Sequence, residues 1–571
     1  MESKKILSMK KLTILLLIAL NTTVHSQESH RGWPELNAFI QQQMGIFNVP
    51  GLSATIIVGD SLVWKNHFGY ANLETNTPVT DATLFGVLSV GKSIITAVAM
   101  QLSENGLLGL DQNINEILPF QVVNPHNNQS NFTPRMLMSH SSSIKDYNIY
   151  NYVTIGDPSV GLAYFMENYL RPGQYYSVSN YYAEIPGNNY HYCNIAPSLT
   201  AYLAEVIADT GFKEYARETM LLSLEMYHSG WFLADINVDN LAIGYDFASG
   251  SYQANPFFGH LSYPALTLRT SALELSNYVM MLLNNGMFKG NQVLQPASVE
   301  AMTTIQNPVW GSSFGKTGLG LYHRTDMGNR EVWGHNGGSA TGYAAQIYFC
   351  KEENTGVVVT TNSNQYVDPI VTRLLDYAAL VVFPEEATEI AETGFTANWE
   401  HAPGATTYFL DVAYNNLFFN YVEGFENLET GYVDSLEITG LEPGTSYYYR
   451  LRAFNGTDTG PNSGAVFVST LFVGLEEPEP PSIKLMIIPN PFTDHLLISF
   501  KIAVDEPVAI SLWNNQGQMV ETIFNRKVPA GDHQLSWNTA RLPTGIYFLR
   551  FMTGDKVVVR RLLNLASLSG H

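Results

Sequence analysis

Residues 84–102 read Leu84-Phe85-Gly86-Val87-Leu88-Ser89-Val90-Gly91-Lys92-Ser93-Ile94-Ile95-Thr96-Ala97-Val98-Ala99-Met100-Gln101-Leu102. From Ser93 to Gly106 the apolar residues recur on one face at helical spacing, which predicts a helix. Ser89 and Lys92 open it three residues apart, so their side chains share a face near the positive helix end. A lysine buried there loses proton affinity and can act as a neutral base. The stretch therefore predicts a nucleophilic serine and its base at the start of a core helix.

The pattern Ser-x-x-Lys is by itself a weak signal, because it occurs four times, at Ser8, Ser89, Ser142 and Ser313. Ser8 lies in a predicted targeting segment, and the copies at Ser142 and Ser313 lie in polar stretches that no apolar helix follows. The copy at Ser89 runs directly into an apolar helix. The sequence context, and not the pattern, selects Ser89.

Strand-like stretches stand before and after the helical part of residues 31–384. Alternating apolar residues predict a hairpin that turns at Gly59-Asp60. Because strands come first and last with helices between them, we expect an α+β fold whose terminal strands share one sheet. The predicted strands are 52–58, 62–68, 342–349 and 356–361, and further helices are predicted at 197–208 and 272–285.

Several motifs of this region occur together in one known family. Residues 31–384 resemble the serine β-lactamase and penicillin-binding-protein superfamily, in particular class C β-lactamase-like proteins. The resemblance implies a β-lactamase/transpeptidase-like catalytic domain, with an antiparallel sheet flanked by helices and an all-helical region, and it implies no metal or organic cofactor. The family usually has Gly where this chain has Ser143. The motifs are Pro50-Gly51-Leu52-Ser53, Phe68-Gly69-Tyr70-Ala71, Thr77-Pro78-Val79-Thr80, residues 84–89, Leu107-Leu108-Gly109-Leu110-Asp111 and residues 133–142.

The family joins a Tyr-x-Asn motif to its serine and lysine. The resemblance implies that Tyr192 passes a proton to the leaving group, with its pKa lowered by a neighbouring cation. It implies that Asn194 binds the lysine and the substrate amide. The pattern also occurs at Tyr70 and Tyr414, but Tyr192 stands after the serine and just before a long predicted helix, as in the family. Cys193 is expected to point away from the pocket and to pack as a small apolar residue.

Two segments compete for the strand that aligns the substrate. Lys316-Thr317-Gly318 spells the Lys-Thr-Gly of β-lactamases, whereas His335-Asn336-Gly337-Gly338 resembles the His-x-Gly form of esterase and D-aminopeptidase relatives. We prefer the second segment, because residues 339–345 continue into a predicted core strand as they do in the family. Backbone N–H groups of Ser89 and Gly338 are then expected to hold the oxyanion, beside His335 and Gly337. Since histidine has an ordinary pKa of ~6.5, His335 weakens carboxylate anchoring at neutral pH and favours an esterase or peptidase.

One further motif is rejected. Residues 311–315 fit Gly-x-Ser-x-Gly, the nucleophile elbow of α/β-hydrolases. That motif requires an apolar strand before it and a helix after it, and the sequence predicts neither.

Two all-β sandwich modules are predicted after the catalytic region. Residues 386–470 resemble a fibronectin type III domain through the turn-and-strand run 441–451 and the early Trp399. We expect this module to act as a spacer. After the stiff linker 476–481, residues 485–566 resemble the C-terminal sorting domain of the type IX secretion system, through Pro489-Asn490-Pro491-Phe492 and residues 542–548. This resemblance implies contact with the type IX secretion machinery and a secreted or cell-surface location, reached via the periplasm.

Composition and the N-terminus narrow the function further. The formal net charge of −21 over 571 residues would repel nucleic acid. Lys10-Lys11, the apolar run 12–20 and Val24-His25-Ser26 predict a signal peptide over residues 1–26, too short in its apolar part to span a bilayer. We expect no transmembrane segment in the mature chain. The two cysteines, at positions 193 and 350, predict neither a disulfide scaffold nor a zinc site.

These patterns together predict an exported serine hydrolase. It is expected to act through an acyl-enzyme on a small-molecule or peptide substrate, either an ester, a D-amino-acid peptide or amide, or a β-lactam. The alternative is a catalytically silent penicillin-binding-like scaffold or cell-surface binding protein. The presence of serine, lysine, tyrosine and asparagine together favours the enzyme.

Overall fold

The computed structural model describes residues 33–306, 311–312, 315–328, 330–339, 341–471, 484–514, 518–554 and 556–564. The predicted signal peptide, the linker 476–481, Ser313 and the tail 566–571 lie outside these residues. The chain forms two compact units, one with the catalytic region and the module after it and one with the C-terminal module. Each unit is described by itself. The boundaries 1–26, 31–384, 386–470 and 485–566 stay predictions.

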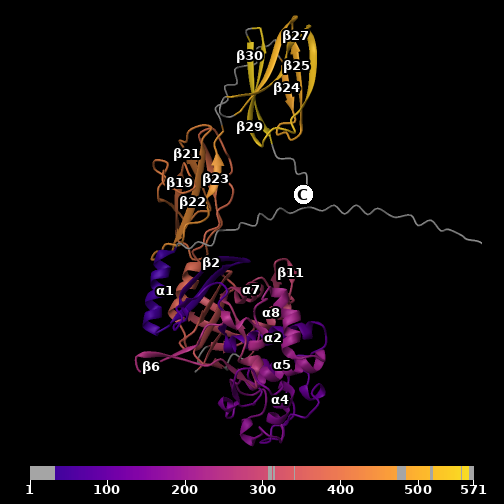
Figure 1. The fold of residues 1–571 in the computed structure, drawn as a ribbon, viewed down its shortest axis with the longest axis vertical. Coiled ribbons are helices and arrows are strands. Elements are labelled where there is room, and N and C mark those ends of the chain that lie inside the picture. Colours follow the sequence, from indigo (N-terminus) through magenta and orange to yellow (C-terminus); the bar gives the residue numbers. More distant parts are fainter. Residues whose placement is uncertain are drawn as a thin grey trace, which may run out of the picture. The chain divides into compact units, whose positions relative to one another are not determined.

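A nine-stranded antiparallel sheet forms the centre of the catalytic region in the described part of the chain (Figure 1). Strand β1 pairs with β2 on one side and with β17 on the other, so the first and last strands share one sheet, as predicted. The α+β fold class is thereby confirmed. The strands, in sheet order, are β12 (Gly311–Ser312), β13 (Gly315–Thr317), β14 (Tyr322–Met327), β15 (Arg330–Ser339), β16 (Tyr343–Cys350), β17 (Thr355–Thr361), β1 (Gly51–Val58), β2 (Ser61–Asn72) and β3 (Thr77–Pro78).

Successive side chains of a strand point to opposite faces of its sheet. Helices cover both faces of this sheet and pack against both sets of side chains. Helices α1 (Pro34–Phe47) and α9 (Asp368–Ala378) share one buried cluster with Leu52 and Ile56 of β1. Helix α7 (Ala272–Leu283) lies on the other face, where Thr55 Oγ1 and Ser276 Oγ are hydrogen-bonded at 2.7 Å. The sheet is therefore buried on both sides.

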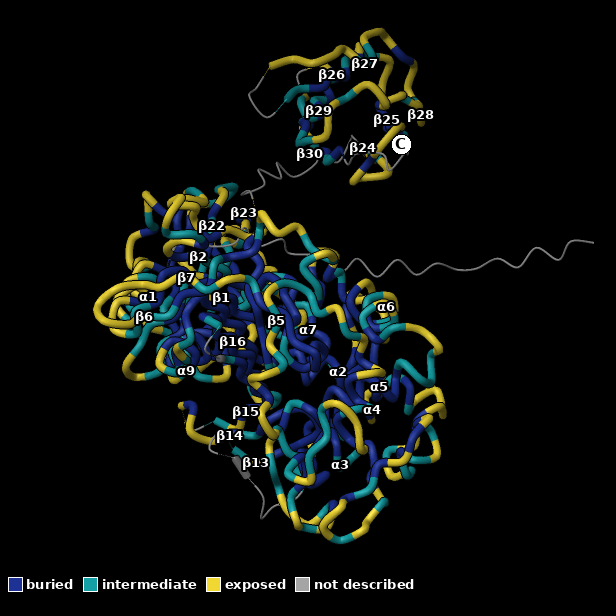
Figure 2. Tube along the Cα trace, turned by 60° about the horizontal axis from the view of Figure 1, so that its bottom comes forward, coloured by how far each residue is buried: buried dark blue, intermediate teal, exposed yellow. Residues whose placement is uncertain are grey.

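Helices α2 (Gly91–Glu104) and α5 (Ile195–Ala208) form the centre of the helical region, and both are largely buried (Figure 2). The helix predicted from Ser93 begins earlier, at Gly91, and one 3₁₀ turn, η1 (Leu88–Val90), precedes it. None of the helices in the described ranges combines the length and apolar character needed to traverse a bilayer. The shorter helices are α3 (Pro134–Met138), α4 (Leu162–Leu170), α6 (Phe212–Ala216) and α8 (Pro296–Met302).

The module after the catalytic region is a β-sandwich, as predicted. Its core contains Trp399 and Tyr447, together with Leu380 from the end of the catalytic region. Arg373 of α9 donates two hydrogen bonds to Asp458, at 2.7 and 2.9 Å, so the module also packs against the catalytic region. Its two sheets are β18 (Gly394–Asn398) with β21 (Ser435–Thr439), and β20 (Leu428–Gly431), β19 (Thr407–Ala413), β22 (Ser446–Phe454) and β23 (Val466–Ser469).

The C-terminal module has its own apolar core, to which Phe492, Leu512 and Leu549 belong. Two antiparallel sheets enclose this core. They are β24 (Lys484–Ile488), β25 (His495–Ile502) and β28 (Gly531–Asn538), and β27 (Met519–Val528), β26 (Glu506–Asn514), β29 (Gly545–Thr553) and β30 (Lys556–Asn564). The second all-β module is therefore present as predicted.

Candidate active site

Ser89 lies on the turn that leads into α2. The residue before it, Leu88, is buried and has a φ of +50°, a left-handed conformation that L-residues other than Asn and Asp seldom adopt. Lys92, only 1% exposed, donates from Nζ to Ser89 Oγ at 2.7 Å and to the carbonyl of Ala265 at 3.2 Å. The helix start thus places an amine directly against the serine hydroxyl, as the i, i+3 spacing predicts.

Tyr192 reaches the same oxygen from just before α5. Its hydroxyl donates to Ser89 Oγ at 2.8 Å, and Lys92 Nζ lies 5.2 Å from the centre of its ring. The ring of His140 packs against it, with 4.5 Å between the ring centres. Tyr192 as a whole is 36% exposed. Two hydrogen-bond donors, one from α2 and one from the segment before α5, therefore converge on one serine oxygen.

Burial shifts the pKa values of Lys92 and Tyr192 in opposite directions. It lowers the pKa of the Lys92 ammonium to about 7, because the charged form loses hydration. Burial of the hydroxyl raises the pKa of Tyr192 well above its ordinary value. The expectation that a neighbouring cation lowers the Tyr192 pKa is wrong, because the loss of hydration outweighs the opposing hydrogen bond with Ser89. Lys92 is the group that can take a proton near neutral pH, and Tyr192 holds its own.

Strand β15 lies against the serine through its glycines. A Cβ atom on Gly337 would lie 2.1 Å from the Val87 carbonyl oxygen and 2.8 Å from the Ser89 amide nitrogen, so only glycine fits. A Cβ atom on Gly338 would lie 3.0 Å from the Tyr366 ring on the opposite face. Residues 335–338, the segment that we preferred for the substrate-aligning strand, therefore lie against η1.

His335 precedes these glycines, on the same face of β15 as Gly337. It is 2% exposed, and its Nδ1 donates to the Asn336 carbonyl at 2.6 Å. Because that carbonyl is an acceptor, Nδ1 carries the proton and Nε2 is an acceptor, which has no hydrogen-bond partner among the described residues. Burial lowers the pKa of His335 to about 3, so the ring is neutral.

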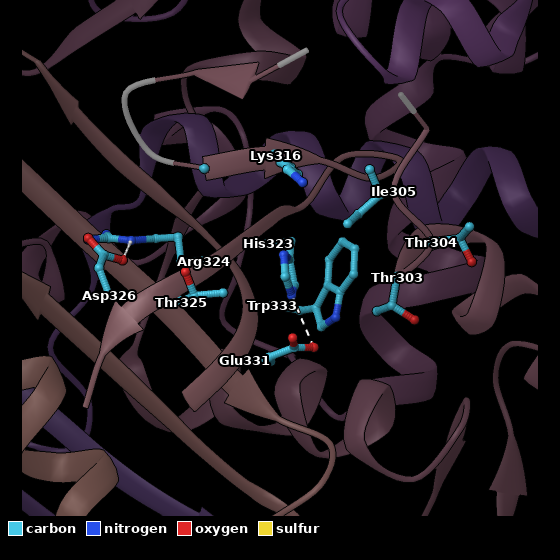
Figure 3. Close-up of a pocket in the computed structure, with 11 residues that line it drawn as sticks. Thr303, Thr304, Ile305, Lys316, His323, Arg324, Thr325, Asp326, Glu331 and Trp333 are labelled. Atoms are coloured by element: carbon cyan, nitrogen blue, oxygen red, sulfur yellow. Dashed lines mark hydrogen bonds and ion pairs between the residues drawn. The ribbon is translucent and has the colours of Figure 1, made fainter. Parts of the chain in front are cut away.

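Lys316, the competing candidate, lies elsewhere. It is exposed on β13 and lines a hollow of about 940 Å³ together with His323, Glu331 and Trp333 (Figure 3). His323 Nε2 and Glu331 are 3.4 Å apart there. None of the residues that line this hollow is a predicted site residue of the Ser89 centre. The ends of the rejected Gly-x-Ser-x-Gly segment belong to β12 and β13, which pair as an antiparallel hairpin. A nucleophile elbow would instead need a strand followed by a helix.

Asn194 has a partner that sequence reasoning missed. Its Nδ2 donates to Asp146 Oδ2 at 2.7 Å, and the described hydrogen bonds include none between Asn194 and Lys92, contrary to what the resemblance implies. Asp146 also accepts the backbone N–H groups of Asn194 and Ile195. A single acid in a polar loop, 48 residues before its partner, carries no pattern that could have identified it.

The loop before Asp146 and the residue beside Tyr192 complete the site. Ser143 has a φ of +57°, in the left-handed region where the family uses Gly, so the loop takes this conformation at a cost of about 1 kcal/mol. Cys193 is fully buried in the main hydrophobic cluster, as expected. Within the described ranges, no group of three or more His, Cys, Asp or Glu side chains could hold a metal ion.

Known proteins are similar to the catalytic region in sequence and in fold. Beta-lactamase-like protein 2 of Dictyostelium discoideum is 24% identical over 63% of this chain and 62% of its own length. A beta-lactamase of Psychrobacter immobilis is 22% identical over 63% of this chain and 91% of its own length. The chain thus spans less than two thirds of the first relative. The octameric penicillin-binding protein homologue from Pyrococcus abyssi has the same fold, with a TM-score of 0.52 at 19% identity over 92% of this chain and 99% of its own.

Three family models match the chain, and they confirm the three resemblances. The fibronectin type III domain model matches residues 384–469, and the secretion system C-terminal sorting domain model matches residues 486–564. The sorting domain indicates a secreted or cell-surface protein. The beta-lactamase model matches residues 36–380. Because this match covers more than half of the 571 residues, the chain belongs to the beta-lactamase family.

Proposed function

We propose that this protein is a serine hydrolase that forms an acyl-enzyme on Ser89. The observation that carries the proposal is the convergence of Lys92 Nζ and the Tyr192 hydroxyl on Ser89 Oγ, at 2.7 and 2.8 Å. A serine hydroxyl is a weak nucleophile until a base within hydrogen-bond reach removes its proton. Lys92 is such a base, because burial lowers its pKa to about 7.

The reaction proceeds in two halves. Lys92 takes the Ser89 proton while Oγ forms a bond to the substrate carbonyl carbon, and the backbone N–H groups of Ser89 and Gly338 hold the oxyanion. The bond to the leaving group then breaks, and Tyr192 gives the leaving group its proton and recovers one from Lys92. Water, deprotonated by the same pair, attacks the acyl-enzyme and restores the Ser89 hydroxyl.

The substrate is proposed to be an uncharged ester or a D-amino-acid peptide or amide in preference to a β-lactam. His335 is neutral because its pKa is lowered to about 3, and its buried Nε2 is an acceptor. A substrate carboxylate at this point would meet a lone pair, without the cation that would pair with it. The sorting domain supports export through the periplasm and the type IX machinery, so the enzyme would act outside the cell.

Intact-mass analysis of the full-length protein tests this function. We expect rapid turnover of p-nitrophenyl butyrate, with no stable adduct after incubation with a fluorescent penicillin. A fluorophosphonate probe should label the protein, with the added mass on the Ser89 peptide. A stable penicilloyl adduct on Ser89 would contradict the preference against β-lactams and would favour a penicillin-binding or D-peptidase role over an esterase. Absence of ester turnover and of any label would favour the catalytically silent scaffold.

Replacing His335 with lysine should shift the substrate preference toward carboxylates. A cation at this position would pair with a penicillin carboxylate, and a charged hydrogen bond contributes about 1.5–3 kcal/mol. The rate of penicilloylation, followed by mass, should therefore rise about tenfold or more relative to ester hydrolysis. His335→Gln, which is neutral and of similar size, is the matched control and should not increase the rate. Equal rates in the lysine and glutamine variants would contradict this assignment.

A further inference from the structure

Asp146 accepts four hydrogen bonds from the residues that begin α5. Its Oδ1 accepts the N–H groups of Asn194 and Ile195 at 2.9 and 3.1 Å. Its Oδ2 accepts Nδ2 and the N–H of Asn194 at 2.7 and 2.8 Å. These backbone groups open α5, whose first N–H groups have no partner within the helix. One carboxylate therefore caps α5 and holds the side chain that follows Tyr192 by two positions.

The contacts fix the charge of this carboxyl group. Every partner that the structure gives to its two oxygens is an N–H donor, whereas a protonated carboxyl would need an acceptor for its own O–H. Burial raises the pKa of Asp146 above its ordinary value, although the N–H groups of Asn194 and Ile195 and the charge of Lys92 oppose the rise by favouring the anion. The donor-only contacts therefore favour the anion of Asp146, which interacts electrostatically with Lys92.

The segment that carries Asp146 is itself held on both sides. The Tyr169 hydroxyl donates to the Lys145 carbonyl at 2.6 Å and accepts the Tyr147 N–H at 2.9 Å. The Lys145 N–H donates to the Asn180 carbonyl at 2.8 Å. Residues 145–147 are thus clamped from α4 and from the segment before Tyr181, which leaves the carboxylate little freedom to move.

Because Nδ2 of Asn194 donates to Asp146, the orientation of the amide oxygen Oδ1 is fixed as well. Asn194 Oδ1 is buried and has no hydrogen-bond partner among the described residues. It is therefore an acceptor whose hydrogen-bonding capacity is not used by the described residues. If the amide were flipped, its NH₂ would be presented in place of the carbonyl oxygen, and the carboxylate would face an oxygen.

We infer that Asp146 is a positioning residue of this site, which holds the start of α5, orients the Asn194 amide and places a negative charge that acts on Lys92. The inference rests on the proposed function, because it assigns a role within the Ser89 reaction. Asp146 does not touch the reacting oxygen, and it acts through Lys92 and Asn194.

Burial moves the pKa values of seven groups that interact with Lys92 or Asp146 away from neutral pH. Burial lowers the pKa of His260 to about 4 and that of His335 to about 3, and it lowers the pKa of His140 well below its ordinary value. Burial raises the pKa of the neighbouring acids, which are Tyr169, Tyr182, Tyr192 and Cys193. The acidic limb of the pH–rate profile is therefore expected to report Lys92.

The test compares the pH profile of kcat/KM for p-nitrophenyl butyrate between full-length wild-type protein and Asp146→Asn. Removing the anion destabilises the Lys92 ammonium and lowers its pKa, so the acidic limb should move to lower pH by about one unit. The kcat should also fall, because a neutral amide cannot accept every one of these N–H groups. Asp157→Asn is the matched control, since Asp157 also caps two backbone N–H groups, at 2.7 and 3.0 Å, outside the site.

Asp146→Glu keeps the charge and serves as the second variant. It should retain the wild-type acidic limb even if its kcat falls. The proposal fails if the limb of Asp146→Asn stays at the wild-type pH, whatever happens to kcat, because the role is then structural. It also fails if neither variant folds, as shown by loss of the thermal transition. Failure of the proposed function is distinguishable, since wild-type protein would then show no ester hydrolysis at all.

Discussion

Ser89→Ala is expected to reduce ester hydrolysis by about 10⁴-fold or more, because no acyl-enzyme can form without the nucleophilic oxygen. Turnover of p-nitrophenyl butyrate measures the loss, and the fluorophosphonate label should disappear with it. The fold should survive, because the hydroxyl is partly exposed and its removal leaves Lys92 bonded to the Ala265 carbonyl. The melting temperature should therefore stay close to that of the wild type.

Ser142→Ala is the matched control for this substitution. Ser142 also heads a Ser-x-x-Lys pattern, but it is buried in the loop before Asp146 and 2% exposed. Its loss should leave labelling and turnover within a few-fold of the wild type. Wild-type turnover in Ser89→Ala, or loss of the label in Ser142→Ala alone, would overturn the assignment of the nucleophile.

Lys92→Met is expected to have the second largest effect, a fall of about 10²–10⁴-fold in kcat/KM, which is the usual contribution of a general base. Methionine has a similar length and no charge, so it fits a pocket in which the lysine is 1% exposed. Acylation by the fluorophosphonate should slow in parallel. Lys65→Met, at a surface lysine that pairs with Asp81 at 2.7 Å, should change neither rate.

The pH dependence of kcat/KM tests the role of Lys92 independently. Burial disfavours the Lys92 ammonium, so its folded-state pKa is lowered to about 7 and the amine is a base only above that pH. Wild-type kcat/KM should therefore fall as the pH drops below about 7, and the residual activity of Lys92→Met should lack this limb. A limb of unchanged position in Lys92→Met would assign the titration to another group.

Local patterns accounted for much of the fold. The hairpin of β1 and β2 followed from alternating residues on either side of Gly59-Asp60, and α2 followed from apolar residues at helical spacing. These signals are local, because each element shows its buried face within a dozen residues. Two strands of the sandwich, β20 and β21, carry no such local signal. Both are short and largely exposed, so they show little of that alternation.

The candidate site was predictable only where a motif carried it. Ser89 and Lys92 are joined by helical spacing, and the resemblance pointed to Tyr192. The role of Asp146 was not predictable, because its contacts with Asn194 depend on how the loop before α4 returns to α5. The direction of the Tyr192 pKa shift was also not predictable, since its largest cause is the burial of the residue, which depends on the folded structure.

The pairing of β1 with β17 has a consequence for how the chain is made and exported. Leu52 and Thr361 are register partners although 309 residues separate them, so the sheet cannot close until almost the whole catalytic region has left the ribosome. Such long-range pairing slows folding. Until β17 arrives, the apolar strand β1 offers an open edge to any other unfolded chain, which is a hazard for aggregation. A nascent chain interrupted before residue 355 would therefore be a candidate for chaperone binding.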